Sequence, residues 1–254
     1  MQYARIKWLN NQPYSTDFND FYFSSDDGLK ETQYVYIDKN NLVERFKNAN
    51  TSTFTIIETG FGSGLNFLAV ANCWLEHAPE SAKLQFISIE KYPLNLADLS
   101  QSHTLWPQFS AISQELIQQY QILKLDCNTF SLAAGRVELN LWACDVKEAL
   151  LAINQAGNAW ILDGFAPTKN QEMWTQEVFE HIARLSQLDT SFATFTSASH
   201  VRRGLQAAGF DCIKHKGFGR KREMLSGIFA DKKSITDVST NKIVEKINIK
   251  NKPL

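Results

Sequence analysis

The distribution of hydrophobic residues predicts a buried parallel β-sheet. Four short runs are almost continuously apolar or β-branched, at residues 53–58 (TFTIIE), 84–90 (LQFISIE), 158–163 (NAWILD) and 191–196 (SFATFT). Strands of a parallel sheet are covered on both faces, so they lack the polar–apolar alternation of a half-exposed strand. We therefore expect these four runs to lie in one sheet.

Segments with helical patterns separate the runs. Helices are predicted at 65–76, 145–153 and 201–208, and on either side of Pro107, at 94–106 and 113–120. Within 171–187, apolar residues recur at helical spacing (Trp174, Val178, Ile182 and Leu185), which predicts one amphipathic helix. Strands that alternate with helices are typical of an α/β fold with a mostly parallel sheet.

Two further strand pairs have no helix between them. Residues 129–143 are predicted to form a hairpin around Ala134 and Gly135. The segments 210–218 and 222–229 form the last pair, which predicts one antiparallel edge strand. The expected fold is Rossmann-like α/β.

The two ends of the chain differ from this central part. Residues 1–50 are aromatic and turn-rich, and FYF (21–23) and QYVYI (33–37) are predicted as strands around the turn SSDDG, before a short helix at 42–46. We therefore expect a small strand-rich N-terminal extension at 1–50 and the main domain at 51–230. Residues 231–254 are polar and are predicted to be a tail or interdomain linker.

Composition changes this picture little. The net charge of −1 points to no partner, and the four cysteines contain no CxxC pair, which favours a reducing compartment over a disulfide framework or a zinc site. The first 15 residues lack the apolar segment of a signal peptide. No apolar run approaches the roughly 18 residues of a membrane span. We expect a cytoplasmic protein without a metal site.

The stretch TIIETGFGSGLNFLAV (55–70) contains the first candidate site, a glycine-rich turn between a strand and a helix. It has no Gly-Lys-Ser/Thr for a triphosphate, and its glycines do not fit the GxGxxG spacing of dinucleotide folds. The spacing ExGxGxG is typical of the S-adenosylmethionine turn of class I methyltransferases. Glycine lets the backbone approach a ligand closely, although a tight turn without a ligand is the alternative. The expected cofactor-binding residues are Glu58, Gly60, Phe61, Gly62, Gly64 and Asn66.

Two acidic residues at later strand ends extend this site. Glu90 ends the second strand, where a carboxylate can accept the ribose hydroxyls, or simply face water. Asp145 lies between a strand and a helix, where it can bind the adenine amino group, cap the helix, or do both.

The loop LDGFAP (162–167) is the candidate catalytic element. Asp163 follows an apolar strand, and ligands of open α/β sheets bind beyond the carboxyl ends of strands. The order of acid, aromatic and proline resembles the loop of enzymes that methylate exocyclic nitrogens. Asp163 could accept a proton from an amine and orient its lone pair, and Phe165 could pack against the base. The alternative is that Asp163 only caps the loop.

A basic segment is the third feature. Residues 200–222 hold one acid, Asp211, and seven basic residues, which are Arg202, Arg203, Lys214, Lys216, Arg220, Lys221 and Arg222. Such a concentration of positive charge is typical of a surface that binds nucleic-acid phosphates, although a solvated basic face is the alternative.

Together these stretches resemble one family. IETGFGSGLNFL, WILDGFAPTKNQEMW, FATFTSASHVRRGLQAAGF and KGFGRKREML are similar to the methyltransferase domain of the MnmC family, and the resemblance covers roughly residues 5–230. It implies methylation, by S-adenosylmethionine, of 5-aminomethyl-2-thiouridine at the wobble position of tRNA, with the anticodon stem-loop as partner. It also implies that Asp163 lies at the reacting amine and that Glu58 and the three glycines form the cofactor turn.

One departure from the family is expected. Family members usually continue into an FAD-dependent oxidase domain, and no dinucleotide fingerprint follows Gly227, so we expect no FAD in this chain. Either a truncated chain or a stand-alone methyltransferase fits this pattern. Two other functions stay open: an aminopropyltransferase resembling spermidine synthase, which the basic segment disfavours, and a non-catalytic RNA-binding module, which the intact glycine turn and Asp163 disfavour.

Overall fold

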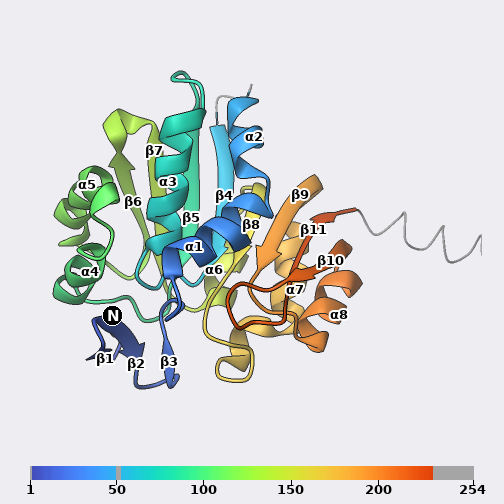
Figure 1. Cartoon of the computed structure of the whole chain (residues 1–254). Coiled ribbons are helices and arrows are strands. Elements are labelled where there is room, and N and C mark those ends of the chain that lie inside the picture. Colours follow the sequence, from blue (N-terminus) through green and yellow to red (C-terminus); the bar gives the residue numbers. More distant parts are fainter. Residues whose placement is uncertain (1, 50–52, 231–254) are drawn as a thin grey trace, which may run out of the picture.

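The computed structural model describes residues 2–49 and 53–230, which form a twisted sheet with helices on both faces (Figure 1). The strands are β1 (Ile6–Leu9), β2 (Gln12–Ser15), β3 (Asp20–Phe21), β4 (Thr53–Thr59), β5 (Lys83–Ile89), β6 (Asp126–Leu132), β7 (Val137–Ala143), β8 (Gly157–Leu162), β9 (Ser186–Thr194), β10 (Phe210–Lys216) and β11 (Glu223–Phe229). The α-helices are α1 (Gly28–Thr32), α2 (Leu42–Lys47), α3 (Leu65–His77), α4 (Leu96–His103), α5 (Ser110–Tyr120), α6 (Val146–Ala152), α7 (Gln176–Arg184) and α8 (Ser199–Ala207). The short helices η1 (Gln33–Asp38), η2 (Pro107–Phe109), η3 (Ala133–Gly135) and η4 (Gln171–Trp174) complete the set.

The main sheet has the strand order β10-β11-β9-β8-β4-β5-β7-β6. The pairs β9/β8, β8/β4, β4/β5 and β5/β7 are parallel, as the apolar runs predict. Successive residues of these strands face opposite sides: Ile56 packs into the core under α3, whereas Ile57 packs into the core under α6 and α7. The expected fold class and the 129–143 hairpin are therefore confirmed.

Both predicted antiparallel pairs form, but the last pair is arranged differently from the prediction. β11 folds back between β10 and β9 and is antiparallel to both, so the edge strand β10 runs in the same direction as β9. At the opposite edge, β6 is antiparallel to β7. The sheet therefore has one antiparallel edge strand, β6, whereas the reversed strand of the last pair, β11, lies inside the sheet.

The strands of the N-terminal extension lie mostly at other residues than predicted. β1–β3 form a small separate sheet below the main one in Figure 1, but QYVYI is the π-helix η1. Asp27 caps α1 by accepting from the Lys30 N–H, and the chain continues from α1 into η1. Its consecutive residues Val35, Tyr36 and Ile37 are all buried, so the apolar run carries no periodicity that separates strand from helix.

The predicted helix at 171–187 is also divided. Thr175 is extended and accepts from the Val178 N–H, so it ends η4 and caps α7. The remainder, from Ser186, is already strand β9. None of the helices in the described residues combines the length and apolar character that a membrane span needs.

Candidate active site

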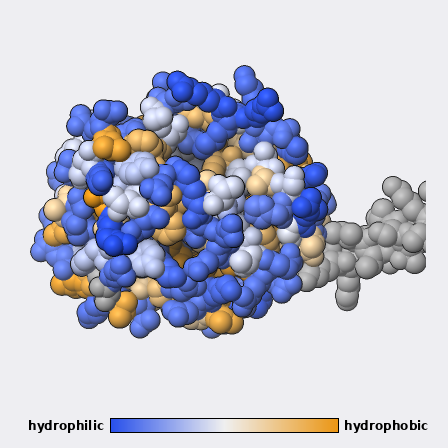
Figure 2. Space-filling model, turned by 90° about the horizontal axis from the view of Figure 1, so that it is seen from below, coloured by the Kyte–Doolittle hydropathy of each residue, from blue (hydrophilic) through white to orange (hydrophobic). Residues whose placement is uncertain are grey.

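A cavity of about 910 Å³ lies beyond the carboxyl ends of β4, β5 and β8. Its wall includes the segments that follow these strands, at 60–63, 90–92 and 163–166, together with residues of the N-terminal extension. Figure 2, which views the molecule from below, shows a hollow with hydrophobic surface inside and hydrophilic residues around it. This is the edge at which open α/β sheets bind their ligands.

Backbone conformation and close neighbouring atoms both favour glycine in this turn. Gly60, Gly62 and Gly64 all have positive φ angles (91°, 55° and 74°), which L side chains rarely adopt. A Cβ on Gly60 would lie 2.9 Å from the Cα of Gly164, and one on Gly62 would lie 3.2 Å from the Tyr22 ring. Gly60, Phe61 and Gly62 line the cavity, so the expected approach of bare backbone to a ligand is geometrically available there.

Two residues of the predicted turn do not line the cavity. Gly64 is the N-cap of α3 in the left-handed conformation, and a Cβ there would meet the Phe61 ring at 2.9 Å. Glu58 is fully buried beneath the turn, where it accepts from Ser88 Oγ at 2.6 Å and Asn66 Nδ2 at 3.0 Å. Burial raises the pKa of Glu58 well above its usual value. Glu58 was predicted to bind the cofactor, but it does not line the cavity, and its carboxyl group instead holds the residues behind the cavity.

Asp163 is held in the cavity wall by three groups. Its Oδ1 accepts from the Gly164 N–H at 2.8 Å, its Oδ2 accepts from Asn66 Nδ2 at 2.8 Å, and its carbonyl accepts from Thr59 Oγ1 at 3.0 Å. Burial raises the pKa of Asp163 to about 6, even though its hydrogen-bond donors favour the charged form. A carboxylate with such a pKa can exchange a proton near neutral pH.

Asn66 is the centre of this arrangement. Its amide nitrogen contacts both Asp163 and Glu58, and its Oδ1 accepts from Thr32 Oγ1 at 2.7 Å. One side chain of α3 thus connects the strand end of β4, the loop after β8 and helix α1. Its position in the cavity wall agrees with the sequence prediction, but its link to Asp163 could not be read from the sequence.

Glu90 and Asp145 both line the cavity. The two Glu90 oxygens accept from the N–H groups of Gly62 and Tyr92, each at 2.9 Å, while burial raises its pKa. Asp145 caps α6 by accepting from the Lys147 N–H and pairs with Lys91 at 2.9 Å. Burial opposes the change, but the contacts with Lys91 and Lys147 lower the pKa of Asp145. Helix capping, one of its two expected roles, is confirmed.

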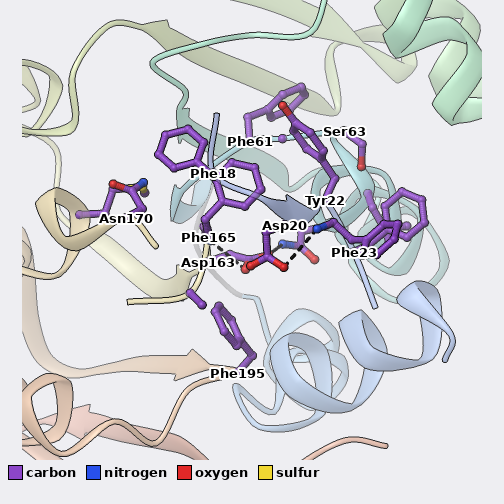
Figure 3. Close-up of a pocket in the computed structure, with 18 of the residues that line it drawn as sticks. Phe18, Asp20, Tyr22, Phe23, Phe61, Ser63, Asp163, Phe165, Asn170 and Phe195 are labelled. Atoms are coloured by element: carbon purple, nitrogen blue, oxygen red, sulfur yellow. Dashed lines mark hydrogen bonds between the residues drawn. The ribbon is translucent and has the colours of Figure 1, made fainter. Parts of the chain in front are cut away.

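Aromatic side chains from distant segments gather over the loop after β8. Phe165 stacks on Phe18 with ring centroids 4.5 Å apart and meets the Tyr22 ring edge-on at 5.3 Å (Figure 3). Trp174 Nε1 donates to the Phe165 carbonyl at 3.1 Å, which fixes the loop. Phe18 and Tyr22 were not predicted as site residues. The aromatic richness of the extension was the available signal, but it was assigned to strands.

The basic residues divide into two groups. Arg220 and Lys221 line the cavity, and Lys221 Nζ pairs with Glu31 at 2.7 Å and lies over the Phe195 ring at 4.3 Å. The Arg220 side chain is 95% exposed, with Asp26 at 3.9 Å. The structure does not bring the other five predicted residues to the cavity wall, which are Arg202, Arg203, Lys214, Lys216 and Arg222. Within the described residues, no cluster of three or more His, Cys, Asp or Glu is arranged to hold a metal ion.

Comparison with known proteins agrees with this geometry. Residues 107–230 match the model of a family described as S-adenosyl-L-methionine-dependent methyltransferases. The tRNA 5-methylaminomethyl-2-thiouridine biosynthesis bifunctional protein MnmC of Aeromonas hydrophila is 47% identical over 240 residues, covering 91% of this chain and 36% of the relative. The protein of the same name from Chromobacterium violaceum is 48% identical over 229 residues, covering 90% and 35%.

The chain therefore spans a little over a third of the length of these curated relatives. Among solved structures, MnmC2 from Aquifex aeolicus superposes with a TM-score of 0.67 at 19% identity, over 91% of this chain and 72% of that one. That likeness shows a shared fold. The resemblance predicted from the sequence motifs is confirmed.

Proposed function

We propose, from the premise that this chain is an S-adenosylmethionine-dependent methyltransferase related to the MnmC proteins, that it methylates the 5-aminomethyl nitrogen of 5-aminomethyl-2-thiouridine at the tRNA wobble position. The product is 5-methylaminomethyl-2-thiouridine, the nucleoside in the names of its relatives. The observation that carries the proposal is Asp163, a half-buried carboxylate in the cavity wall beside the glycine turn. An amine substrate needs a proton acceptor at this place.

The residues around the turn fit the cofactor. Gly60 and Gly62 leave backbone bare where a side chain would meet neighbouring atoms, and Glu90 offers carboxylate oxygens to ribose hydroxyls. Asp145 is assigned to the adenine side. When bound, S-adenosylmethionine supplies an electrophilic methyl group on sulfur. We assign no FAD chemistry to this chain.

The protein's own contribution to the reaction is proton transfer and orientation. An aliphatic ammonium group has no lone pair and cannot attack a methyl group, so it must first lose a proton. Asp163, with a pKa of about 6, takes this proton when it is in the carboxylate form. Phe165, stacked on Phe18 and held through Trp174, provides an apolar surface against which the base can pack.

The RNA is assigned to the open side of the cavity. Arg220, which is almost fully exposed, and Lys221 are the basic residues placed to meet phosphates of the anticodon stem-loop. An unpaired base can stack on aromatic side chains, and Phe18, Tyr22 and Phe165 are available there. We propose residues 51–230 as the catalytic domain and 1–50 as the extension that completes it, acting in the cytoplasm.

The test is transfer of labelled methyl from S-adenosylmethionine to tRNA that carries 5-aminomethyl-2-thiouridine, followed by nucleoside analysis. Label in 5-methylaminomethyl-2-thiouridine is expected, and Asp163→Asn should lose the transfer while it keeps cofactor affinity. Wild-type protein that binds the cofactor but transfers no methyl label to this tRNA would contradict the proposal. The aminopropyltransferase-like alternative would instead transfer the aminopropyl group to a polyamine and leave the labelled methyl group on sulfur. Normal turnover by Asp163→Asn would remove this residue from the mechanism.

A further inference from the structure

A second carboxylate shares the cavity with Asp163. Glu31, on helix α1, lines the same cavity although only 11% of its side chain is exposed. The next residue of α1, Thr32, donates to Asn66, which in turn donates to Asp163. One short helix of the extension therefore supplies Glu31 and fixes the amide that holds the catalytic carboxylate.

Lys221 pairs with Glu31. Its ammonium group contacts Glu31 Oε1 at 2.7 Å and is itself held over the Phe195 ring. In the part of the chain that the structure describes, no hydrogen bond engages Glu31 Oε2. The charge of Glu31 acts on Asp163, whose pKa it helps to raise, and on the buried Tyr36 beside it. Both carboxylates line the same cavity.

We propose that Glu31 is a specificity-determining residue that selects a primary amine and stops the reaction after one methyl group. The proposal rests on the proposed function. A neutral primary amine has two N–H groups and one lone pair, so two carboxyl groups can each accept one N–H while the lone pair points to the methyl donor.

The product no longer fits this arrangement. After one transfer and loss of a proton, the nitrogen has a single N–H, and its methyl group takes the place of the other. A second attack would leave one carboxylate oxygen, such as Glu31 Oε2, facing that methyl group without a donor, which is costly. An N-substituent that carries a negative charge would in addition be repelled by Glu31.

The experiment compares two rates in wild-type protein and variants. The substrates are tRNA carrying 5-aminomethyl-2-thiouridine and the same tRNA carrying 5-methylaminomethyl-2-thiouridine, and mass spectrometry of the nucleosides counts the methyl groups added. In Glu31→Ala we expect about a tenfold loss of kcat/KM for the primary amine, the effect of one charge-assisted hydrogen bond, and a dimethylated product. The ratio of the second to the first transfer rate should rise at least tenfold.

Lys221→Met is the matched control. It breaks the same ion pair but keeps the carboxylate, so it should weaken RNA binding and still give only the monomethyl product. Glu31→Gln, which keeps the shape and loses the charge, should raise the rate ratio severalfold and carries the test if the alanine variant does not fold. A rate ratio unchanged in both Glu31 variants would overturn the inference, as would dimethylation by Lys221→Met alone. Wild-type protein that methylates neither tRNA would instead contradict the proposed function.

Discussion

The amide of Asn66 is the most informative single group to remove. Its Nδ2 donates both to Asp163 Oδ2, at 2.8 Å, and to the buried Glu58 Oε1, at 3.0 Å. Asn66→Leu keeps the approximate size of the side chain and removes both of these hydrogen bonds, together with the one that Asn66 Oδ1 accepts from Thr32. Because the donated bond favours the carboxylate form, its loss should raise the pKa of Asp163 further above its value of about 6.

The expected size of the pKa shift follows from the strength of the hydrogen bond between Asn66 and Asp163. A hydrogen bond to a charged group contributes about 1.5–3 kcal/mol, and one pH unit corresponds to about 1.4 kcal/mol, so the pKa should rise by roughly one to two units. Proton acceptance needs the carboxylate form, so the acidic limb of the kcat/KM profile should move to higher pH by the same amount. The free energy of unfolding should fall by about 1–3 kcal/mol, because buried acceptors lose their donor.

The measurement is the pH dependence of methyl transfer at subsaturating tRNA, together with urea unfolding. Ser88→Ala is the matched control, since it removes the 2.6 Å bond to Glu58 Oε2 without touching Asp163. It should lower stability and leave the acidic limb in place. The reasoning is refuted if the Asn66 variant loses stability while its acidic limb coincides with that of the wild type.

Three further predictions follow from the same geometry. Gly62 has a φ of 55° and lies close to the Tyr22 ring, so Gly62→Ala should weaken S-adenosylmethionine binding at least tenfold by calorimetry. Gly135→Ala, also at positive φ but with its nearest neighbour 3.9 Å away, should keep the affinity. Equal affinities of the two variants would show that the cofactor does not bind at the turn. Asp163 has a folded pKa of about 6 against an ordinary value of 3.8, so the folded protein binds the extra proton and stability should fall by roughly 3 kcal/mol as pH rises from about 4 to 6. In urea unfolding, the Asp163→Asn variant should not show this fall in stability with rising pH. The same fall as in the wild type would contradict the pKa assigned to Asp163. Arg220→Ala should reduce the slope of log K for tRNA against log salt by up to about one, whereas Arg203→Ala on α8 should change it less; the reverse order would place the RNA on α8.

The central fold was predictable because its physical signals are local. The runs in β4, β5 and β8 are mostly apolar, and the glycine turn lies between the end of β4 and the start of α3. Elements whose identity depends on tertiary contacts were not predictable. Val35, Tyr36 and Ile37 are covered on all sides in η1, so the sequence there lacks the alternation that distinguishes strand from helix.

The residues of the candidate site also fall into two groups, those that could be predicted from the sequence and those that could not. Asp163 and Glu90 could be predicted because each follows a strand whose carboxyl end meets the others at one edge. The contributions of Phe18 and Glu31 could not, because they depend on how the extension folds over that edge, far away in sequence. The basic segment illustrates a further limit: its charge is visible in the sequence, but only folding shows that Lys221 is paired with an acid.

The contact between Gly60 and Gly164 has a consequence for the order of binding. The two backbones are so close that a Cβ on Gly60 would lie 2.9 Å from the Gly164 Cα, and Thr59 Oγ1 donates across the same junction to the Asp163 carbonyl. The turn assigned to the cofactor and the loop assigned to the acceptor are therefore in direct contact. We expect a ligand that orders one of them to order the other, and so to favour binding of the second ligand. Because such coupling is reciprocal, RNA should then tighten cofactor binding by the same factor by which the cofactor tightens RNA binding.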